Sequence, residues 1–394
     1  MLASLYDWFW KDQYWFPTQY SWTDMEDSDG VIYPHPKDLL AVFPVIFVII
    51  IVRYSFERVV ALPLSRFMGV QDSRRIKAFH NPILESFFHT QSKKPKEAQL
   101  NLLATQCNLS LRQVQRWFRD RRNQERPLLS KKFCEACWKF VFYFSSFFGG
   151  LLTIYNEPWF WKSELCWDGF PKQPLKPGIY WWYLLELGLY ISMMLTFAFD
   201  VKRKDFKEQI IHHSSTIILI CHSYFSNYLR IGTLVMLIHD VSDIFLEMGK
   251  MLKYAQWEKS SKVIFIIFTL IFFISRLFVF PYKVLYTTYY SSMVNHKPFF
   301  GYYFTNGFLM ILQALNIFWS SLILHMFFKV CIMGQMQNDV RSDVEEQCTS
   351  DEQSEARKQN SGHSESSQDL ETFLSPREPG RLSPTIRHRP VPAT

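Results

Sequence analysis

Apolar residues along this 394-residue chain gather in long stretches that polar segments separate. A transmembrane helix needs about 20 mostly apolar residues, because a helix satisfies its own backbone hydrogen bonds in lipid. Seven stretches meet this length at least loosely: Leu39–Phe56, Trp138–Tyr155, Ile179–Phe199, Ile210–Leu229, Ile231–Met248, Val263–Tyr282 and Phe299–Phe328. The pattern therefore predicts an all-α polytopic membrane protein with about seven transmembrane helices.

The polar segments set the expected domain boundaries. Residues 1–36 lack the basic region, apolar run and cleavage site of a signal peptide, so the first transmembrane helix, 37–58, must drive membrane entry. A basic segment, 67–128, separates it from a second helical block at 131–332. Residues 335–394 are rich in Ser, Glu, Gln and Pro, so we expect a disordered tail that buries too little apolar surface to offset its ordering entropy.

Composition and charge refine this picture. Aromatic residues make up 18% of the chain, which is typical of membrane helices with interfacial aromatic belts. Basic residues cluster between Arg74 and Lys132, whereas the segment from Asn156 to Gly178 is acidic and aromatic. The positive-inside rule therefore predicts a lumenal N-terminus and a cytosolic C-terminus. The sequon Asn108-Leu-Ser110 would then lie in the cytosol, without glycosylation.

The segment from Asn81 to Pro127 resembles a homeodomain, whose third helix reads the major groove. Its Trp117-Phe118 pair and the following arginines match the third-helix pattern, but Asp120 replaces the adenine-reading Asn and would direct a carboxylate toward phosphates and bases. One interpretation is a DNA-binding module. The other, which we favour, is a small cytosolic three-helix module whose arginines face acidic lipid headgroups. DNA binding is not expected.

Ionisable residues interrupt two neighbouring apolar stretches. The first stretch contains His212 and His213, and the second contains His239, Asp240 and Asp243, followed by Glu247. Ionisable groups inside a bilayer cost several kcal/mol, so such residues indicate function. Spacings of three and four residues place most of the second set on one helix face. The short connection between the stretches predicts an antiparallel hairpin that could set His212 or His213 against Asp240 or Asp243.

Three interpretations of this polar cluster compete. Buried polar residues can hold membrane helices together, although with modest energies. Histidines with carboxylates can bind iron or zinc, but the His-rich spacing of a membrane di-iron hydroxylase is absent. The third interpretation is acid–base or nucleophilic chemistry, with a carboxylate orienting an imidazole. We favour chemistry without a metal, because the cluster holds more ionisable groups than packing requires.

The same residues carry a family resemblance. The run from Phe199 to Phe206, the pair His212-His213, and the pattern His239-Asp240-x-x-Asp243-x-x-x-Glu247-x-x-Lys250 together resemble the Lag1 motif of ceramide synthases. The resemblance implies a six-helix TLC domain over residues 131–332. It also implies an endoplasmic reticulum enzyme that transfers a long acyl chain, of eighteen to twenty carbons, from acyl-CoA to the amine of sphinganine or sphingosine. Acyl-CoA is then a co-substrate, no cofactor is expected, and the chain would form homo- or heterodimers.

The chemistry of the cluster, taken together with the resemblance, leads to a hypothesis about the roles of particular residues. His212 would act as nucleophile or base, Asp240 and Asp243 would orient or polarise the site, and His213 and His239 would support it. Substrate contacts are expected from Glu247 and from the basic run Lys202, Arg203 and Lys204, which could equally be a topology signal. Acyl-chain selectivity is assigned to Tyr286, Thr287, Thr288, Tyr289, Tyr290, Ser291, Ser292 and Met293. Ser342, in an acidic context, is a candidate phosphorylation site.

A non-enzymatic alternative remains open. The same fold could belong to a membrane protein that binds lipid or assists translocation without acyl transfer. One departure from the family also concerns the N-terminal segment, where many relatives carry a glycosylation sequon. Here the corresponding stretch, Thr18-Gln-Tyr-Ser21, lacks the asparagine.

Overall fold

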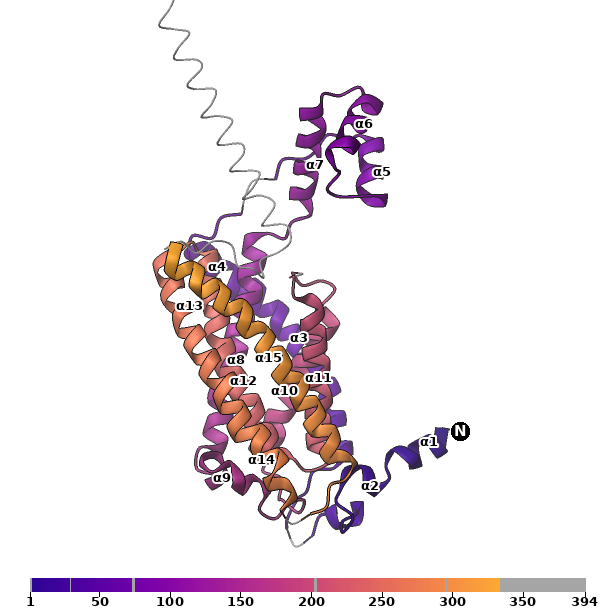
Figure 1. The fold of residues 1–394 in the computed structure, drawn as a ribbon, viewed down its shortest axis with the longest axis vertical. Helices are drawn as coiled ribbons and strands as arrows, with labels where there is room; N and C mark the ends of the chain where they lie inside the picture. Colours follow the sequence, from indigo (N-terminus) through magenta and orange to yellow (C-terminus); the bar gives the residue numbers. More distant parts are fainter. Residues whose placement is uncertain (1, 29, 73–74, 202–203, 295, 334–394) are drawn as a thin grey trace, which may run out of the picture. The chain divides into compact units, whose positions relative to one another are not determined.

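The computed structural model describes residues 2–28, 30–72, 75–201, 204–294 and 296–333. In these ranges the chain forms helices joined by short loops, and no strand is present beyond one isolated bridge between Ser28 and Val31 (Figure 1). The all-α prediction is therefore confirmed for the part of the chain that the structure describes.

The helices follow one another along the chain in three groups. The N-terminal group contains α1 (Leu2–Phe9), α2 (Asp12–Trp15), η1 (Trp22–Met25), η2 (Pro36–Ala41), α3 (Val42–Phe56), η3 (Glu57–Ala61) and α4 (Leu62–Phe67). The second group contains α5 (Pro82–Thr90), α6 (Glu97–Cys107) and α7 (Leu111–Glu125). The third contains α8 (Leu129–Ile154), α9 (Pro158–Trp161), η4 (Ser163–Trp167), α10 (Pro177–Thr196), α11 (Phe206–Phe225), α12 (Leu229–Tyr254), α13 (Glu258–Phe272), η5 (Phe273–Leu285), α14 (Tyr286–Tyr289), η6 (Ser291–Met293) and α15 (Phe300–Met333).

Several helices are suited to a membrane. Four helical stretches are long and apolar enough to cross one: Pro36–Phe67, Leu111–Ile154, Glu258–Met293 and Phe300–Val330. α10, α11 and α12 pack in the same bundle, but aromatic, histidine and acidic residues lower their hydropathy. The chain is therefore a multi-pass membrane protein, while the count of seven spans stays a prediction.

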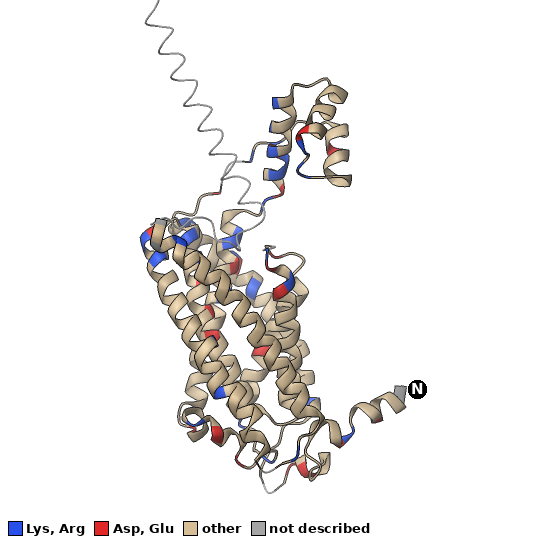
Figure 2. Cartoon of the chain, viewed as in Figure 1, with Lys and Arg blue, Asp and Glu red and all other residues tan. Residues whose placement is uncertain are grey.

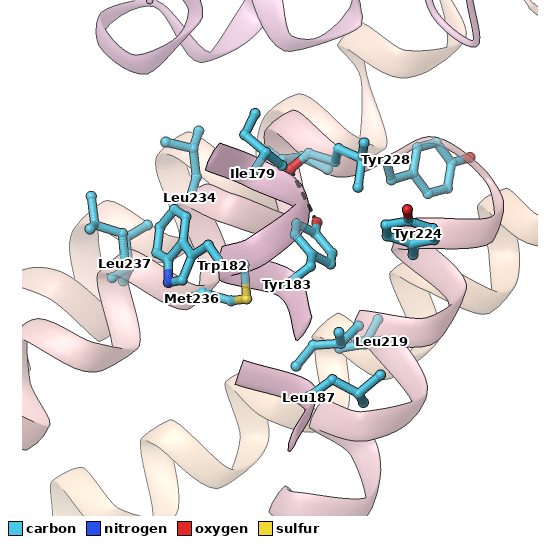
Figure 3. Packing of buried hydrophobic residues seen from close by; sticks show 14 of the residues in the cluster. Ile179, Trp182, Tyr183, Leu187, Leu219, Tyr224, Tyr228, Leu234, Met236 and Leu237 are labelled. Carbon is cyan, nitrogen blue, oxygen red and sulfur yellow. Dashed lines mark hydrogen bonds between the residues drawn. The ribbon is translucent and has the colours of Figure 1, made fainter. Parts of the chain in front are cut away.

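The bundle core forms where α10 packs against α11 and α12. Figure 3 shows Tyr183 of α10 near Leu219 and Tyr224, with Leu234, Met236 and Leu237 also buried around α10. The Tyr183 hydroxyl donates to Leu229 O at 3.1 Å and contacts Ser223 Oγ at 2.7 Å. Gly232 is required beside it, because a Cβ there would lie 2.0 Å from the Tyr183 hydroxyl oxygen.

The hairpin of α11 and α12 opens away from its connection. Only three residues join the two helices, as the short linker predicted. However, α12 packs mainly against α8 and α13, whereas α11 packs against α10 and α15. Each helix therefore packs mainly against other helices, although the rings of His212 and His239 still lie 6.1 Å apart across the hairpin. The space between them is part of the candidate site.

The homeodomain-like module has a core of its own. Leu84, Phe88, Leu103, Val114, Trp117 and Phe118 are buried together between α5, α6 and α7. Asp120 is also buried, and its Oδ1 lies 3.4 Å from Arg119 Nε. We expected this carboxylate to project outward, and the structure shows that it does not. Arg121 pairs with Glu85 at 2.8 Å and lies over the Phe88 ring. Asp120 and Arg121 therefore make contacts within the module, whereas Arg116 and Arg119 remain exposed.

Candidate active site

The start of α11 is fixed to α15 by hydrogen bonds. Asp205 precedes the first turn of α11, and its Oδ2 accepts from Trp319 Nε1 of α15 at 3.1 Å. Its Oδ1 accepts from Gln209 Nε2 one turn into the helix. These contacts set the position and rotation of α11, and so of His212 and His213 two turns into it.

His212 lies at the meeting point of four helices. Its ring lies nearly parallel to that of His239 on α12, with ring centroids 6.1 Å apart. Trp319 of α15 meets it edge-on at 5.4 Å, and Tyr190 of α10 lies at 6.4 Å. Its Nδ1 is buried and has no hydrogen-bond partner among the described residues. The structure thus brings His212 to His239 and leaves a ring nitrogen available for chemistry.

His239, whose ring faces His212, has a defined tautomer. His239 Nδ1 lies 2.7 Å from Val235 O, and a carbonyl can only accept, so the neutral ring must carry its proton on Nδ1. Its Nε2 then holds a lone pair, and this atom is buried without a partner in the described chain. His213 packs against Tyr190 and Phe197 and also has an unpartnered Nδ1. All three histidines therefore retain unused hydrogen-bonding capacity.

The two aspartates of α12 face different partners. Asp240 Oδ2 accepts from Ser146 Oγ of α8 at 2.9 Å, and Ser146 also contacts Glu186 of α10. Asp243 Oδ1 accepts from Arg276 Nη2 of η5 at 2.8 Å. No hydrogen bond joins either aspartate to His212 or His213 in the described structure. The short connection suggested such a pairing, but Asp240 and Asp243 hydrogen-bond to residues of α8 and η5 instead.

Arg276 is a functional candidate that the helical spacing did not reveal. Its side chain is buried and also donates to His239 O, Ser242 Oγ and Asn316 Oδ1. It therefore ties η5 and α15 to the part of α12 that carries His239. The sequence did indicate Arg276, since an arginine inside an otherwise apolar stretch costs several kcal/mol and therefore points to a function. Glu186, within another apolar stretch, carries the same signal.

Two cavities meet at His212. The apolar chamber lies between α11 and α12. Its wall includes Tyr183, Tyr190, His212, Leu219, His222, Tyr228, Ile231, Val235, His239, Thr305 and Leu309. The polar vestibule is lined by charged and polar residues that include Glu135, Lys139, Asp200, Gln209, His212, His213, Asp243, Glu247, Lys250 and Arg276. Among the residues that the structure describes, only His212 and Tyr190 border both cavities. An imidazole therefore stands where an apolar space meets a polar one.

Figure 2 shows charged residues part-way along the bundle and at its ends. Glu247 belongs to the vestibule and pairs with Lys250 at 2.6 Å. Lys204 precedes α11 in a turn, whereas Lys202, Arg203 and Ser342 fall outside the described residues. Among the described residues, no three His, Cys, Asp or Glu side chains converge as metal ligands would.

The residues expected to set acyl selectivity lie away from the two cavities. Thr287, Thr288 and Ser292 are buried, whereas Tyr286, Tyr289 and Tyr290 are exposed. None of the eight residues from Tyr286 to Met293 lines the chamber or the vestibule. The segment reaches the bundle through Tyr289 O, which accepts from the Tyr302 hydroxyl of α15 at 3.2 Å. The segment also contacts η5 and η4, so its influence on the chamber can pass through these elements as well as through α15.

Comparison with known proteins identifies the family. A family model described as the TLC domain matches residues 132–325, and one described as Homeodomain matches residues 74–127. Ceramide synthase 4 of Homo sapiens is 55% identical over 352 residues, which cover 89% of each chain. Human ceramide synthase 3 is 45% identical over 88% of this chain and 90% of the relative, and human ceramide synthase 5 is 40% identical over 87% and 88%. Because these identities extend over most of both chains, the protein belongs to the ceramide synthase family.

Proposed function

We propose that this chain transfers a long acyl group from acyl-CoA to the amine of sphinganine or sphingosine, giving dihydroceramide or ceramide. The observation that carries the proposal is the position of His212 between the polar vestibule and the apolar chamber. An acyl-CoA has the same division, with a charged headgroup at one end of its thioester and an apolar tail at the other. Bound across the two cavities, its thioester would lie at His212.

The vestibule suits the headgroup. Lys139 and Lys250 line it, and the basic run Lys202, Arg203 and Lys204 precedes α11 in the chain. Lysines bind phosphate groups as point charges, so these residues are our candidates for contacts with coenzyme A. Glu247, paired with Lys250, would position that lysine and could meet the sphingoid amine.

We favour a covalent route. A nitrogen of His212 attacks the thioester carbonyl, the carbon–sulfur bond breaks, and the imidazole proton leaves with the thiolate as coenzyme A. The sphingoid amine then attacks the acyl-imidazole, the amide bond forms as the bond between the acyl carbon and the imidazole nitrogen breaks, and the amine proton returns to the imidazole. His239 Nε2, with its lone pair, could relay that proton. In the alternative route, His212 acts only as a base while amine and thioester react directly.

Asp243 and Asp240 would act through their neighbours. Asp243 holds Arg276, which in turn holds the backbone carbonyl of His239. Asp240 joins α12 to α8 and α10 through Ser146. Both aspartates therefore orient the helix that presents His239 to His212.

The remaining parts of the proposal rest on the family and on charge. We propose acyl chains of C18–C20, with the segment from Tyr286 to Met293 acting on selectivity through α15. We also propose an endoplasmic reticulum location with a lumenal N-terminus and a cytosolic C-terminus, and homo- or heterodimers as the assembled form.

Purified protein with stearoyl-CoA and sphinganine tests the proposal. His212→Ala should reduce dihydroceramide formation by about a thousandfold or more, as loss of a nucleophile does. Asp240→Ala should also abolish the activity, whereas His325→Ala, at an exposed histidine of α15, should leave it unchanged. Unchanged product from His212→Ala would refute the site assignment. Absence of product from the unaltered protein would instead favour a non-catalytic lipid-binding or translocation-associated protein.

Pre-steady-state kinetics separate the two routes. The covalent route predicts a burst of coenzyme A before any sphingoid base is added, with acyl label retained on the protein. The burst should vanish in His212→Ala. Strictly sequential kinetics without acyl-enzyme would leave only the direct route.

A further inference from the structure

The apolar chamber has a defined far end. His222, Tyr228 and Thr305 line it there, at the last turn of α11 and the first turns of α15. His212 and His222 are ten residues apart on one helix, which places them about 15 Å apart along its axis. An acyl chain that starts at His212 and enters the chamber therefore runs toward His222.

The N-terminal segment closes the chamber behind His222. Trp15, which does not line the chamber, stacks on the His222 ring with centroids 5.4 Å apart and planes 29° apart. The Trp15 indole is buried and is held by a hydrogen bond from its Nε1 to Phe9 O at 2.8 Å. His222 is thus a single layer between the chamber and this indole.

Trp15 belongs to a compact group that we name the aromatic cap. The cap comprises Trp10, Tyr14, Trp15, Phe16, Tyr20, Trp22, Met25 and Tyr33. Phe225 at the end of α11 contacts both Trp10 and Trp15 edge-on at about 5.5 Å. Because Trp15 is 8% and Phe16 0% exposed, the cap packs as a core rather than as a loose tail.

The cap also sits directly on α15. A Cβ at Gly301 would lie 2.9 Å from Tyr14 O and 3.3 Å from His222 Nε2, so no side chain of α15 separates the cap backbone from His222 there. Tyr14 packs edge-on against Phe300 at 5.5 Å. On the chamber side, Thr305 Oγ1 contacts His222 Nδ1 at 3.1 Å. The cap, His222 and the first turns of α15 therefore form one continuous wall.

We propose that Trp15 is a specificity-determining residue and that the aromatic cap, acting through Trp15 and His222, sets the longest acyl chain that the chamber accepts. This inference rests on the proposed acyl transfer and extends it to residues outside the TLC-domain match. The wall limits length because a chain that reaches His222 can extend further only by displacing a stacked indole. The segment from Tyr286 to Met293 does not line the chamber; it meets this wall at Tyr302 of α15.

The experiment measures product chain lengths. The full-length protein receives sphinganine and an equimolar mixture of acyl-CoA esters from palmitoyl to lignoceroyl, and mass spectrometry resolves the dihydroceramides. Trp15→Ala should raise the ratio of products longer than C20 to C18 product by about tenfold or more, because one methylene in an apolar pocket gives discrimination of that order. Trp15→Phe, which keeps an aromatic ring against His222, should remain close to the unaltered protein.

A second variant works from inside the chamber. Thr305→Leu adds volume in front of His222 without touching the cap and should shift the products toward chains shorter than C18. It keeps the inference testable if Trp15→Ala does not fold. Trp8→Ala is the matched control, since Trp8 lies in the same N-terminal segment and is 54% exposed; it packs on Tyr14 at 5.5 Å, but no ring contact joins it to Trp15 or His222 in the described structure.

The outcomes separate this inference from the proposed function. An active Trp15→Ala protein whose product distribution is unchanged overturns the role of the cap. Equal shifts in Trp15→Ala and Trp8→Ala also overturn it, since the effect would then be general loosening. If Trp15→Ala yields no product, an unchanged distribution in Thr305→Leu overturns the end wall. If the unaltered protein forms no dihydroceramide at all, acyl transfer itself is refuted instead.

Discussion

Ser146 carries one hydroxyl proton, yet its oxygen lies beside three partners. Trp182 Nε1 donates to it at 2.9 Å, and on the other side it meets one oxygen of Glu186 and one of Asp240. A hydroxyl can donate to only one of two carboxyl groups, so the other must donate to the hydroxyl. The hydrogen-bond count therefore requires one proton shared between Glu186 and Asp240.

This count leads to a prediction for Glu186. Glu186→Gln should keep most of the activity, because an amide can donate to Ser146 as a protonated carboxyl would. Glu186→Ala should lower the stability in detergent by about 1–3 kcal/mol and lower the activity with it, since it leaves buried polar groups unpaired. Thermal unfolding and dihydroceramide formation measure the two effects. The shared proton is excluded if the glutamine variant is as damaged as the alanine variant.

At the scale of elements, one buried arginine holds three helices together. Arg276 of η5 binds Asp243 and the His239 carbonyl of α12, and it contacts Asn316 of α15. Each of these partners lies 33 to 40 residues from Arg276 in the chain, so spacing along one helix could not identify them. The sequence indicated which helices carry ionisable groups, but only packing between helices decides which groups meet.

Removing this arginine should cost more than removing the whole ion pair. Arg276→Ala leaves Asp243 buried without its cation and should destabilise the protein by about 3–5 kcal/mol. The double variant Asp243→Asn with Arg276→Gln removes both charges and should be more stable than Arg276→Ala. Chemical or thermal unfolding in detergent gives the comparison. Equal stability of the unaltered protein, Arg276→Ala and the double variant would show that the ion pair does not hold the helices together.

The homeodomain-like module allows a prediction about pH. Arg121 hydrogen-bonds to Glu85 and lowers the pKa of that carboxyl. A carboxyl whose pKa is lower in the folded state stabilises the fold above its unfolded pKa, and this contribution disappears as the pH falls through the folded pKa. The module, residues 75–127, should therefore lose stability as the pH falls below the ordinary range for glutamate.

The matched variant is Glu85→Gln. Its stability should be lower than that of the unaltered module at neutral pH and should depend less on acid. Because 35% of the Glu85 side chain is exposed and solvent screens the ion pair, we expect a small difference, measurable by circular dichroism during thermal unfolding. Identical acid dependence in the two proteins would show that the Arg121 contact does not contribute.

At the scale of the whole molecule, the sequence predicted the helical class and the family but not the shape of the site. Long apolar stretches and ionisable interruptions are local features, so His212 and the α12 cluster were evident from the chain alone. The opening of α11 from α12 was not, because it depends on the surface that each helix buries against α8, α10, α13 and α15. The aromatic cap likewise depends on contacts between residues more than two hundred positions apart, such as Trp15 and His222.

The orientation of the molecule in the membrane can be tested with its own sequons. Gln19 is exposed, and Gln19→Asn would complete an acceptor sequence with Tyr20 and Ser21. Glycosylation occurs only on the lumenal side, so a lumenal N-terminus predicts a mass shift that an endoglycosidase removes. Asn108, exposed in the natural sequon of the module, is the internal control and should stay unmodified in the cytosol. Modification at Asn108 together with no shift from Gln19→Asn would reverse the topology, and with it the side from which acyl-CoA reaches the vestibule.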